Sequence, residues 1–118
     1  MNRLGLFAAL TGFLAVALGA FGAHALDGTL TAEGLDWWHT ATLYALPHAA
    51  MALAIALHSG NGLIRKAGWA FVFGTIVFAG SLYAMALGAP RWFGAITPIG
   101  GVSYLVGWGL CAVGASRS

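Results

Sequence analysis

Charged residues are scarce in this sequence, and their scarcity excludes most classes of soluble protein. Only 7% of the 118 residues are charged, whereas 60% are hydrophobic and the mean hydropathy is +0.86. A soluble domain carries about 25% charged residues. Five basic and three acidic residues are also too few for a nucleic-acid-binding surface. The composition therefore predicts one small domain, residues 1–118, that is integral to a membrane and has no nucleic-acid partner.

The groups that usually carry catalysis or bind metals are also rare. The single cysteine, Cys111, cannot form an internal disulfide, so it does not indicate a redox compartment. The three carboxylates, Asp27, Glu33 and Asp36, all fall between hydrophobic runs. Those runs contain no Ser-His-acid set, no zinc-ligand spacing and no phosphate-binding loop. We therefore expect a protein that is not an enzyme and that has no metal site and no cofactor.

Long uncharged runs take up most of the chain. The first, Leu4 to Ala23, is roughly 30 Å long as a helix, which matches the hydrocarbon core of a bilayer. Turn signals, including Ser59-Gly60-Asn61-Gly62, divide the remainder into further runs. The expected spans are residues 4–24, 37–58, 67–88 and 97–115. The sequence thus predicts an all-α integral membrane protein, a four-helix antiparallel transmembrane bundle with short connections.

A cleavable secretory signal is the alternative interpretation of the first run. Arg3, the apolar run and Ala23-His24-Ala25 together resemble a signal peptide with its cleavage site. The run is longer than the usual hydrophobic region of a signal peptide, and the rest of the chain is equally apolar. We therefore expect the run to be a retained first span.

The basic residues predict the orientation of the bundle. Four of the five lie on one side of a four-span chain: Arg3, Arg65, Lys66 and Arg117. Arg91 alone lies on the other side. Because basic residues in short loops favour the cytoplasm, both termini are predicted to be cytoplasmic (N-in/C-in).

Small residues repeat at helical spacing in every predicted span, which indicates close helix packing. In lipid, helices associate through packing rather than by expelling water, and small residues allow their backbones to approach. The first span has an entirely small stripe, which also includes Ala8 and Ala15. The glycines expected at helix contacts are Gly5, Gly12, Gly19, Gly22, Gly74, Gly100 and Gly107.

Polar residues gather in the outer half of the predicted bundle. His48 lies near the membrane midplane, where an ionisable side chain is costly and usually faces protein or water. Tyr44 shares its helix face at i and i+4. The inner half has little beyond Thr11, Thr75, Trp108 and Cys111. The candidate ligand-binding residues are His24, His39, Tyr44, His48, Ser81, Tyr83, Thr97 and Tyr104.

Other roles remain open for the histidines. His48 could be a neutral side chain that hydrogen-bonds across helices. A haem would need two facing axial histidines, such as His24 with His39 or His48. A copper site could combine His48 with Met51 and Met85. His24 and His39 are predicted at a membrane interface, where solvated or capping roles are common.

Several motifs together resemble a known family. They are Gly19–Leu26, His48-Ala49, Gly80–Tyr83, Thr97–Gly101 and Gly107-Trp108. In this order they resemble the small YgdD/YwdK-like membrane family, a domain of unknown function related to vertebrate transmembrane protein 256. The resemblance implies four transmembrane helices and, for bacterial members, the inner membrane, but no reaction. It marks as motif positions His24, His48, Ser81, Tyr83, Thr97 and Pro98.

Two functions of different classes follow from these observations. In the first, the protein is a multi-pass protein of the bacterial inner membrane that binds a small ligand, a lipid group or an ion in an outer-half polar pocket. In the second, it is a structural or accessory subunit whose glycine and alanine faces pack against a larger membrane partner or against another copy. A transporter is a third reading, which four short spans could support only as an oligomer.

Overall fold

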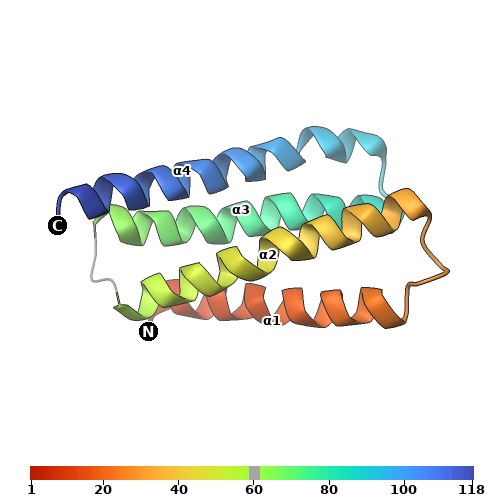
Figure 1. Cartoon of the computed structure of the whole chain (residues 1–118), viewed down its shortest axis with the longest axis horizontal. Helices are drawn as coiled ribbons and strands as arrows, with labels where there is room; N and C mark the ends of the chain where they lie inside the picture. Colours follow the sequence, from red (N-terminus) through yellow and green to blue (C-terminus); the bar gives the residue numbers. More distant parts are fainter. Residues whose placement is uncertain (59–61) are drawn as a thin grey trace.

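The computed structural model describes residues 1–58 and 62–118, and within these ranges the chain is helical, with no strand. The helices are α1 (Arg3–His24), α2 (Ala32–His58), α3 (Leu63–Ala86) and α4 (Thr97–Ser116), with a 3-10 helix η1 (Arg91–Ala95) before α4. They run antiparallel, and both termini lie at the same end of an elongated molecule of 49 × 25 × 20 Å (Figure 1). Each of the four is long and apolar enough to cross a membrane. The all-helical, four-span prediction is therefore confirmed. The turn predicted at Ser59-Gly60-Asn61-Gly62 falls largely outside the described residues.

Helix α2 begins five residues before the expected span, because a side chain caps it. The Thr31 hydroxyl accepts a hydrogen bond of 2.9 Å from the Gly34 backbone N–H. Such a cap satisfies one of the backbone N–H groups that have no partner at the start of a helix. The negative charge of Glu33 in the first turn also stabilises the helix, because it lies at the positive end of the helix dipole. The helix therefore extends past the Trp37-Trp38 pair. It reaches the end of the molecule that carries Asp27, Glu33 and Asp36, which we call the acidic end.

Helix α3 starts earlier and ends earlier than its expected span. It begins at Leu63, so that Arg65 and Lys66 lie in its first turn. It ends in a Schellman motif, in which the Ala89 N–H donates to the Ala84 carbonyl at 2.9 Å and the Gly88 N–H to the Met85 carbonyl at 3.0 Å. Gly88 has φ +113°, a conformation that side chains disfavour, so this position suits glycine.

Helices α1 and α2 approach along the small stripe of α1. A methyl group added at Gly12 would lie 3.7 Å from the Ala49 Cβ, an ordinary contact. At Gly19 it would lie 2.8 Å from Thr42 Cγ2, and at Gly22 only 2.0 Å from the Trp38 indole nitrogen. The stripe therefore lets α1 receive the side chains of α2. Gly5 differs, because its nearest neighbour is the side chain of Asn2, which caps α1.

The backbones of α3 and α4 approach one another more closely than those of α1 and α2. A Cβ at Gly100 would lie 2.4 Å from the Phe78 backbone nitrogen and 2.8 Å from the Gly74 carbonyl oxygen. At Gly107 it would lie 2.4 Å from the Phe71 ring. Contact between backbones leaves no room for any side chain at Gly100.

Helix α3 is the centre of the bundle. It packs against α1, α2 and α4, whereas α4 packs on α3 and η1 (Figure 1). Half of the spanning segment of α3 is buried, compared with 17% for α4. The backbones of α2 and α4 therefore stay apart, and a groove lies between them.

Candidate functional site

Both ring nitrogens of His48 are hydrogen-bonded, Nδ1 within α2 and Nε2 to α4. Its Nδ1 lies 2.7 Å from the Tyr44 carbonyl oxygen, which can only accept a hydrogen bond. The Trp108 indole N–H, which can only donate, lies 3.1 Å from Nε2. These two partners require a neutral imidazole with its proton on Nδ1. His48 is buried, with 8% of its surface exposed.

An aromatic cluster surrounds His48. The Tyr104 ring stacks on the imidazole with centroids 3.7 Å apart and planes 15° apart. The Tyr104 hydroxyl donates to Thr75 Oγ1 at 2.9 Å, which anchors the ring to α3. Tyr44 packs against Phe78 of α3, with the ring centroids 5.0 Å apart. The α2 and α4 helices thus meet through side chains rather than backbones.

This cluster forms one wall of a groove of about 560 Å³ between α2 and α4. Thr40 and Pro98 lie toward the acidic end of the molecule, and Trp108 is the lining residue of α4 farthest from that end. The lining residues are Thr40, Tyr44, His48, Phe78, Pro98, Gly101, Val102, Tyr104, Leu105 and Trp108. Most of the lining is apolar, two hydroxyl groups (Thr40 and Tyr44) lie in the part nearer the acidic end, and the polar atoms of His48 and Trp108 further in are paired with each other.

Two hydroxyl groups in the groove stand out by their lack of protein partners. In residues 1–58 and 62–118, no hydrogen bond joins the side chain of Thr40 or the hydroxyl of Tyr44 to another group of the protein. Tyr44 is 44% exposed. Side chains on a helix lean toward its N-terminus, and α2 begins at the acidic end, so this tendency favours hydroxyls directed toward that end. They are the polar groups of the groove that a ligand can reach.

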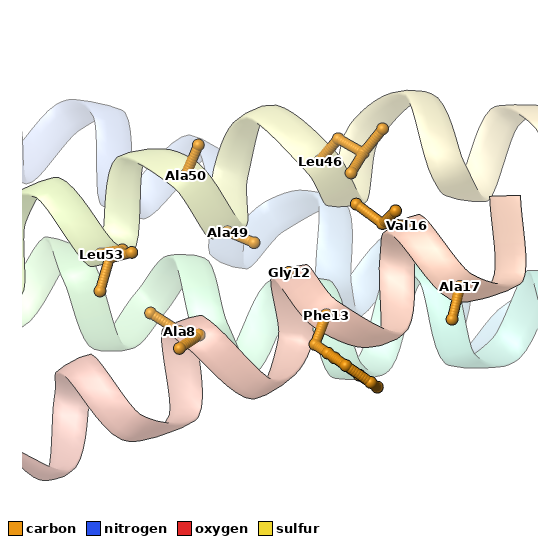
Figure 2. Close-up of a pocket in the computed structure, with 10 residues that line it drawn as sticks. Ala8, Gly12, Phe13, Val16, Ala17, Leu46, Ala49, Ala50 and Leu53 are labelled. Atoms are coloured by element: carbon orange, nitrogen blue, oxygen red, sulfur yellow. The ribbon is translucent and has the colours of Figure 1, made fainter. Parts of the chain in front are cut away.

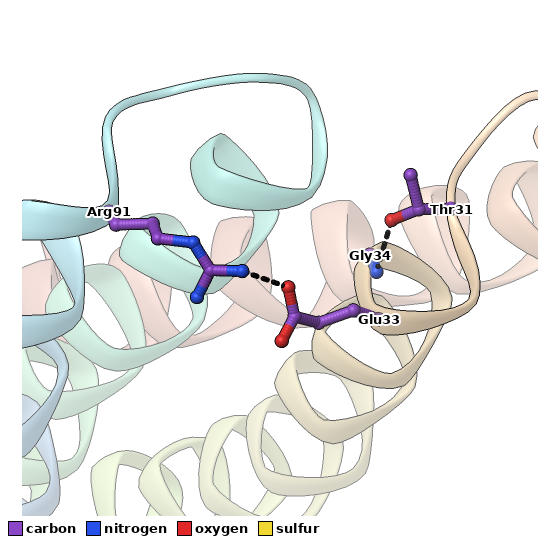
Figure 3. Close-up of polar contacts among 4 residues, drawn as sticks. All are labelled: Thr31, Glu33, Gly34 and Arg91. Atoms are coloured by element: carbon purple, nitrogen blue, oxygen red, sulfur yellow. Dashed lines mark hydrogen bonds and ion pairs between the residues drawn. The ribbon is translucent and has the colours of Figure 1, made fainter.

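An ion pair lies beyond these hydroxyls. The guanidinium of Arg91, at the start of η1, donates to a carboxylate oxygen of Glu33 in the first turn of α2 (Figure 3). The guanidinium also lies over the Trp37 ring, 5.5 Å from its centroid. The pair therefore links the α2 side of the groove to the segment that leads into α4.

The remaining candidate residues lie elsewhere. The Ser81 hydroxyl lies 2.5 Å from that of Thr97 and donates to the Phe78 carbonyl, which ties α3 to the first turn of α4. The Tyr83 hydroxyl lies 2.6 Å from Thr42 Oγ1, on the side of α3 that faces α1 and α2. Both sets are engaged in helix contacts rather than turned to a cavity that includes His48.

His24 and His39 are exposed at the acidic end of the bundle. His39 borders a separate depression beside α1, with Gly19 and Thr42. The eight predicted residues therefore do not form one pocket. The structure brings together Tyr44, His48 and Tyr104. The other five lie apart from this cluster, although Ser81 and Thr97 contact each other.

The arrangement leaves His48 without a nitrogen for metal coordination. Both ring nitrogens are hydrogen-bonded to protein groups. In the described residues, no group of three or more His, Cys, Asp or Glu side chains is placed to hold a metal ion. Neither a haem nor a copper ion fits the observed contacts of His48.

Sequence reasoning missed several residues of this region. Trp108 was expected in the inner half of the bundle, but it reaches His48. Thr40 was not singled out, although it precedes Tyr44 by one turn. Trp38, which was not singled out as a candidate either, is 1% exposed and donates to the Leu18 carbonyl at 2.8 Å, so it is a core residue. The i, i+4, i+8 spacing of Thr40, Tyr44 and His48 was the available signal.

A second groove lies on the other side of α2, between α2 and α1 (Figure 2). Its volume is about 590 Å³. Its floor is formed by small residues such as Gly12 and Ala49, and Phe13 and Leu53 stand at its borders. The full lining is Ala8, Ala9, Gly12, Phe13, Val16, Ala17, Leu46, Ala49, Ala50 and Leu53.

The four apolar helices, the exposed large hydrophobic side chains along them and the segregation of charge at the ends define an integral membrane protein. The family model for a "protein of unknown function (DUF423)" matches residues 18–101. The chain belongs to this family, whose curated members carry the name UPF0382.

Its relatives are similar over nearly their whole length. A UPF0382 membrane protein of Staphylococcus saprophyticus is 46% identical over 90% of both chains. The UPF0382 inner membrane protein YgdD of Escherichia coli is 44% identical, over 95% of this chain and 88% of its own. The UPF0382 membrane protein YwdK of Bacillus subtilis is 39% identical over 92% of both. No solved structure matches the chain. The resemblance to the YgdD/YwdK-like family is confirmed.

Proposed function

We propose that this protein is a non-enzymatic, multi-pass protein of the bacterial inner membrane that holds a membrane lipid in the groove between α2 and α4. The observation that carries the proposal is the polarity of this groove. Two hydroxyls without protein partners lie near its acidic end, and a mostly apolar lining continues inward from them. A lipid has the same order of polar and apolar parts.

The depth of Tyr44 strengthens this proposal. It lies seven residues, or roughly 10 Å, inward from Trp37 along α2, at the level of the acyl chains or their ester groups. A hydroxyl without a partner is costly in hydrocarbon. A lipid ester at that level would supply an acceptor for the Tyr44 hydroxyl, and its chain would cover Leu105 and Trp108.

The orientation follows from the ends of the bundle. Arg3, Arg65 and Arg117 lie at the end that carries both termini (Figure 1). Arg91, at the opposite end, pairs with Glu33. Because unpaired basic residues favour the cytoplasm, both termini are proposed to be cytoplasmic, and the groove then opens to the outer leaflet.

Cysteine labelling in intact cells tests this orientation. Thr29→Cys and Ser118→Cys place a thiol at opposite ends of the bundle, on exposed positions. A membrane-impermeant maleimide should label Thr29→Cys in intact cells and Ser118→Cys only after the membrane is opened. The reverse pattern would overturn the proposed orientation.

A groove-filling substitution tests lipid binding. A Cβ at Gly101 would lie 4.0 Å from Phe78 Cδ2, so Gly101→Leu can enter the groove without displacing the backbone. Gly109→Leu on the same helix is the matched control, because nothing lies within 4 Å of a Cβ there. We expect native mass spectrometry of protein purified from membranes to show a retained lipid in the wild type and in Gly109→Leu, and its loss in Gly101→Leu. Equal lipid retention in all three would contradict the proposal.

The second candidate function is that of an accessory subunit that associates through the groove between α1 and α2. The small residues on its floor favour this alternative, since they let another transmembrane helix approach closely (Figure 2). Ala9→Leu and Ala50→Leu would fill the groove, and Ala112→Leu on α4 is the control. A fall in the molecular mass of the native complex with the first two variants alone would support this function, and an unchanged monomer in all cases would oppose it.

A further inference from the structure

One face of α2 continues from the groove to the acidic end of the protein. Glu33, Trp37, Thr40, Tyr44 and His48 are spaced by three or four residues and therefore share this face. Fifteen residues separate the first from the last, or roughly 22 Å of helix. This is about half of the 40–45 Å of a bilayer with its headgroups. The face therefore spans one leaflet, with Glu33 at headgroup level.

We propose that the Glu33–Arg91 pair is a headgroup site for a zwitterionic aminophospholipid whose acyl chain lies in the groove between α2 and α4. This inference rests on the proposed lipid-binding function. The Arg91 guanidinium takes the lipid phosphate, and the Glu33 carboxylate takes the ammonium group. The two protein charges then exchange their mutual contact for contacts with the two charges of one headgroup.

The geometry of Arg91 suits a phosphate. A guanidinium has five N–H donors in a planar fork, and a single Nη2 bond to Glu33 accounts for the contact with that carboxylate. The Arg91 side chain is 76% exposed, so other donors are accessible to a ligand. The Trp37 ring lies beneath the guanidinium and attracts its charge. Arginine in this setting can bind a phosphate through two parallel hydrogen bonds.

The charges at this end select among headgroups. Among the described residues, Asp27, Glu33 and Asp36 share this end of the molecule with a single arginine, Arg91. A purely anionic headgroup would approach an excess of negative charge, and a purely cationic one would meet Arg91. A headgroup with a phosphate and a primary ammonium two carbons apart complements the adjacent Arg91 and Glu33.

The experiment compares lipids that differ only in their headgroups. The full-length protein in detergent is titrated with phosphatidylethanolamine, phosphatidylglycerol or diacylglycerol with identical acyl chains, and bound lipid is measured by native mass spectrometry. We expect phosphatidylethanolamine to bind about tenfold more tightly than either of the others, which corresponds to one charge-assisted contact. Equal affinities, or tighter binding of phosphatidylglycerol, would overturn the proposal.

Variants at the pair assign the preference to its residues. Arg91→Gln should lower the affinity for phosphatidylethanolamine toward that for diacylglycerol, because it removes the contact with the phosphate. Glu33→Gln should weaken phosphatidylethanolamine binding and strengthen phosphatidylglycerol binding, because it removes a repelling carboxylate. Arg117→Gln, an exposed arginine at the opposite end, is the control and should change neither affinity. An unchanged lipid preference in Arg91→Gln would overturn the assignment.

Two further arms separate the possible causes of failure. Inorganic phosphate at millimolar concentration should not displace the lipid, and if it does, the site binds free phosphate rather than a headgroup. Gly101→Leu should weaken all three lipids equally, because it obstructs the acyl chain. If Gly101→Leu weakens binding but the headgroups do not differ, the groove binds lipid and the headgroup site is wrong. If Gly101→Leu has no effect, the groove proposal itself fails.

Discussion

Two grooves of nearly equal volume, about 590 Å³ and 560 Å³, flank α2 and differ in how their walls are held together. Between α1 and α2, small residues bring the backbones close, and the groove is a shallow furrow above that contact (Figure 2). Between α2 and α4, the backbones stay apart, and His48, Tyr104 and Trp108 bridge the gap.

This difference separates packing strength from binding capacity. A contact between small residues gains dispersion along its whole length but offers no polar group to a ligand. A contact made by aromatic and polar side chains leaves space between them and hydroxyls at its edge. In a membrane protein, the chemistry of a groove is therefore more informative about binding than its volume.

The largest expected effect comes from separating α4 from α3, which would destroy the α2–α4 groove and spare the other. Gly100→Ala places a methyl group 2.4 Å from the Phe78 backbone nitrogen. A change of rotamer cannot relieve this clash, because the clashing atom belongs to the backbone. We expect the free energy of unfolding, measured by SDS titration in mixed micelles, to fall by about 3 kcal/mol. Gly12→Ala in the α1–α2 contact should be neutral or slightly stabilising, since its Cβ finds ordinary contact at 3.7 Å. Equal losses at the two positions would contradict the difference between the grooves.

A smaller effect is expected from removing the bridge across the α2–α4 groove. Trp108→Phe keeps an aromatic ring but deletes the N–H that His48 Nε2 accepts. Leaving a buried acceptor unpaired should lower the free energy of unfolding by about 2 kcal/mol. The ¹⁵N chemical shift of Nε2 should also move as it loses its hydrogen bond.

Trp69→Phe is the matched variant for this measurement. Trp69 is 41% exposed and packs against Phe7 of α1, at 5.9 Å between ring centroids. Its replacement should leave the His48 signals unchanged. A shift of the His48 signals in Trp69→Phe, or none in Trp108→Phe, would be inconsistent with the hydrogen bond.

The smallest effect distinguishes two tyrosine hydroxyls on opposite sides of the bundle. Tyr83 Oη is hydrogen-bonded to Thr42 Oγ1 at 2.6 Å, so Tyr83→Phe should cost about 1 kcal/mol. In lipid-free detergent, Tyr44→Phe should cost nothing, because the described residues give its hydroxyl no partner. In the presence of the lipid that binds, Tyr44→Phe should weaken binding and Tyr83→Phe should not. A stability loss as large for Tyr44→Phe as for Tyr83→Phe would count against a free hydroxyl in the groove.

The helices were predictable because hydrophobic length and turn signals act locally along the chain. The ends shifted where the capping chemistry was underestimated. The second span was expected to begin at Trp37, yet the Thr31 hydroxyl caps α2, which starts at Ala32. Gly88 was expected inside the third span, yet its positive φ closes α3 at Ala86. Hydropathy does not register these events, since neither residue is charged.

The candidate site was only partly predictable, because sequence gives depth along a helix but not the direction in which a face points. Tyr44 and His48 share a helix, so their spacing sufficed to pair them. Tyr83 and Tyr104 were both expected in the outer half of neighbouring helices, yet α3 is central and turns Tyr83 toward Thr42, whereas Tyr104 lies level with Thr75. Counting from Thr97, Trp108 is eleven residues in, as His48 is from Trp37, and this shared depth was the overlooked sign of their contact.

The central position of α3 also fixes an order of biogenesis. When α1 and α2 have entered the membrane, the hydroxyl of Thr42 still awaits Tyr83 and Asn2 still awaits Arg65, both of which arrive with α3. Helix α4, which packs on α3, comes last and closes the wall that contains Trp108. A nascent chain halted after α3 would therefore be a three-helix scaffold that lacks the α2–α4 groove. If the groove holds a lipid as proposed, the lipid would enter only when synthesis of the chain is almost finished.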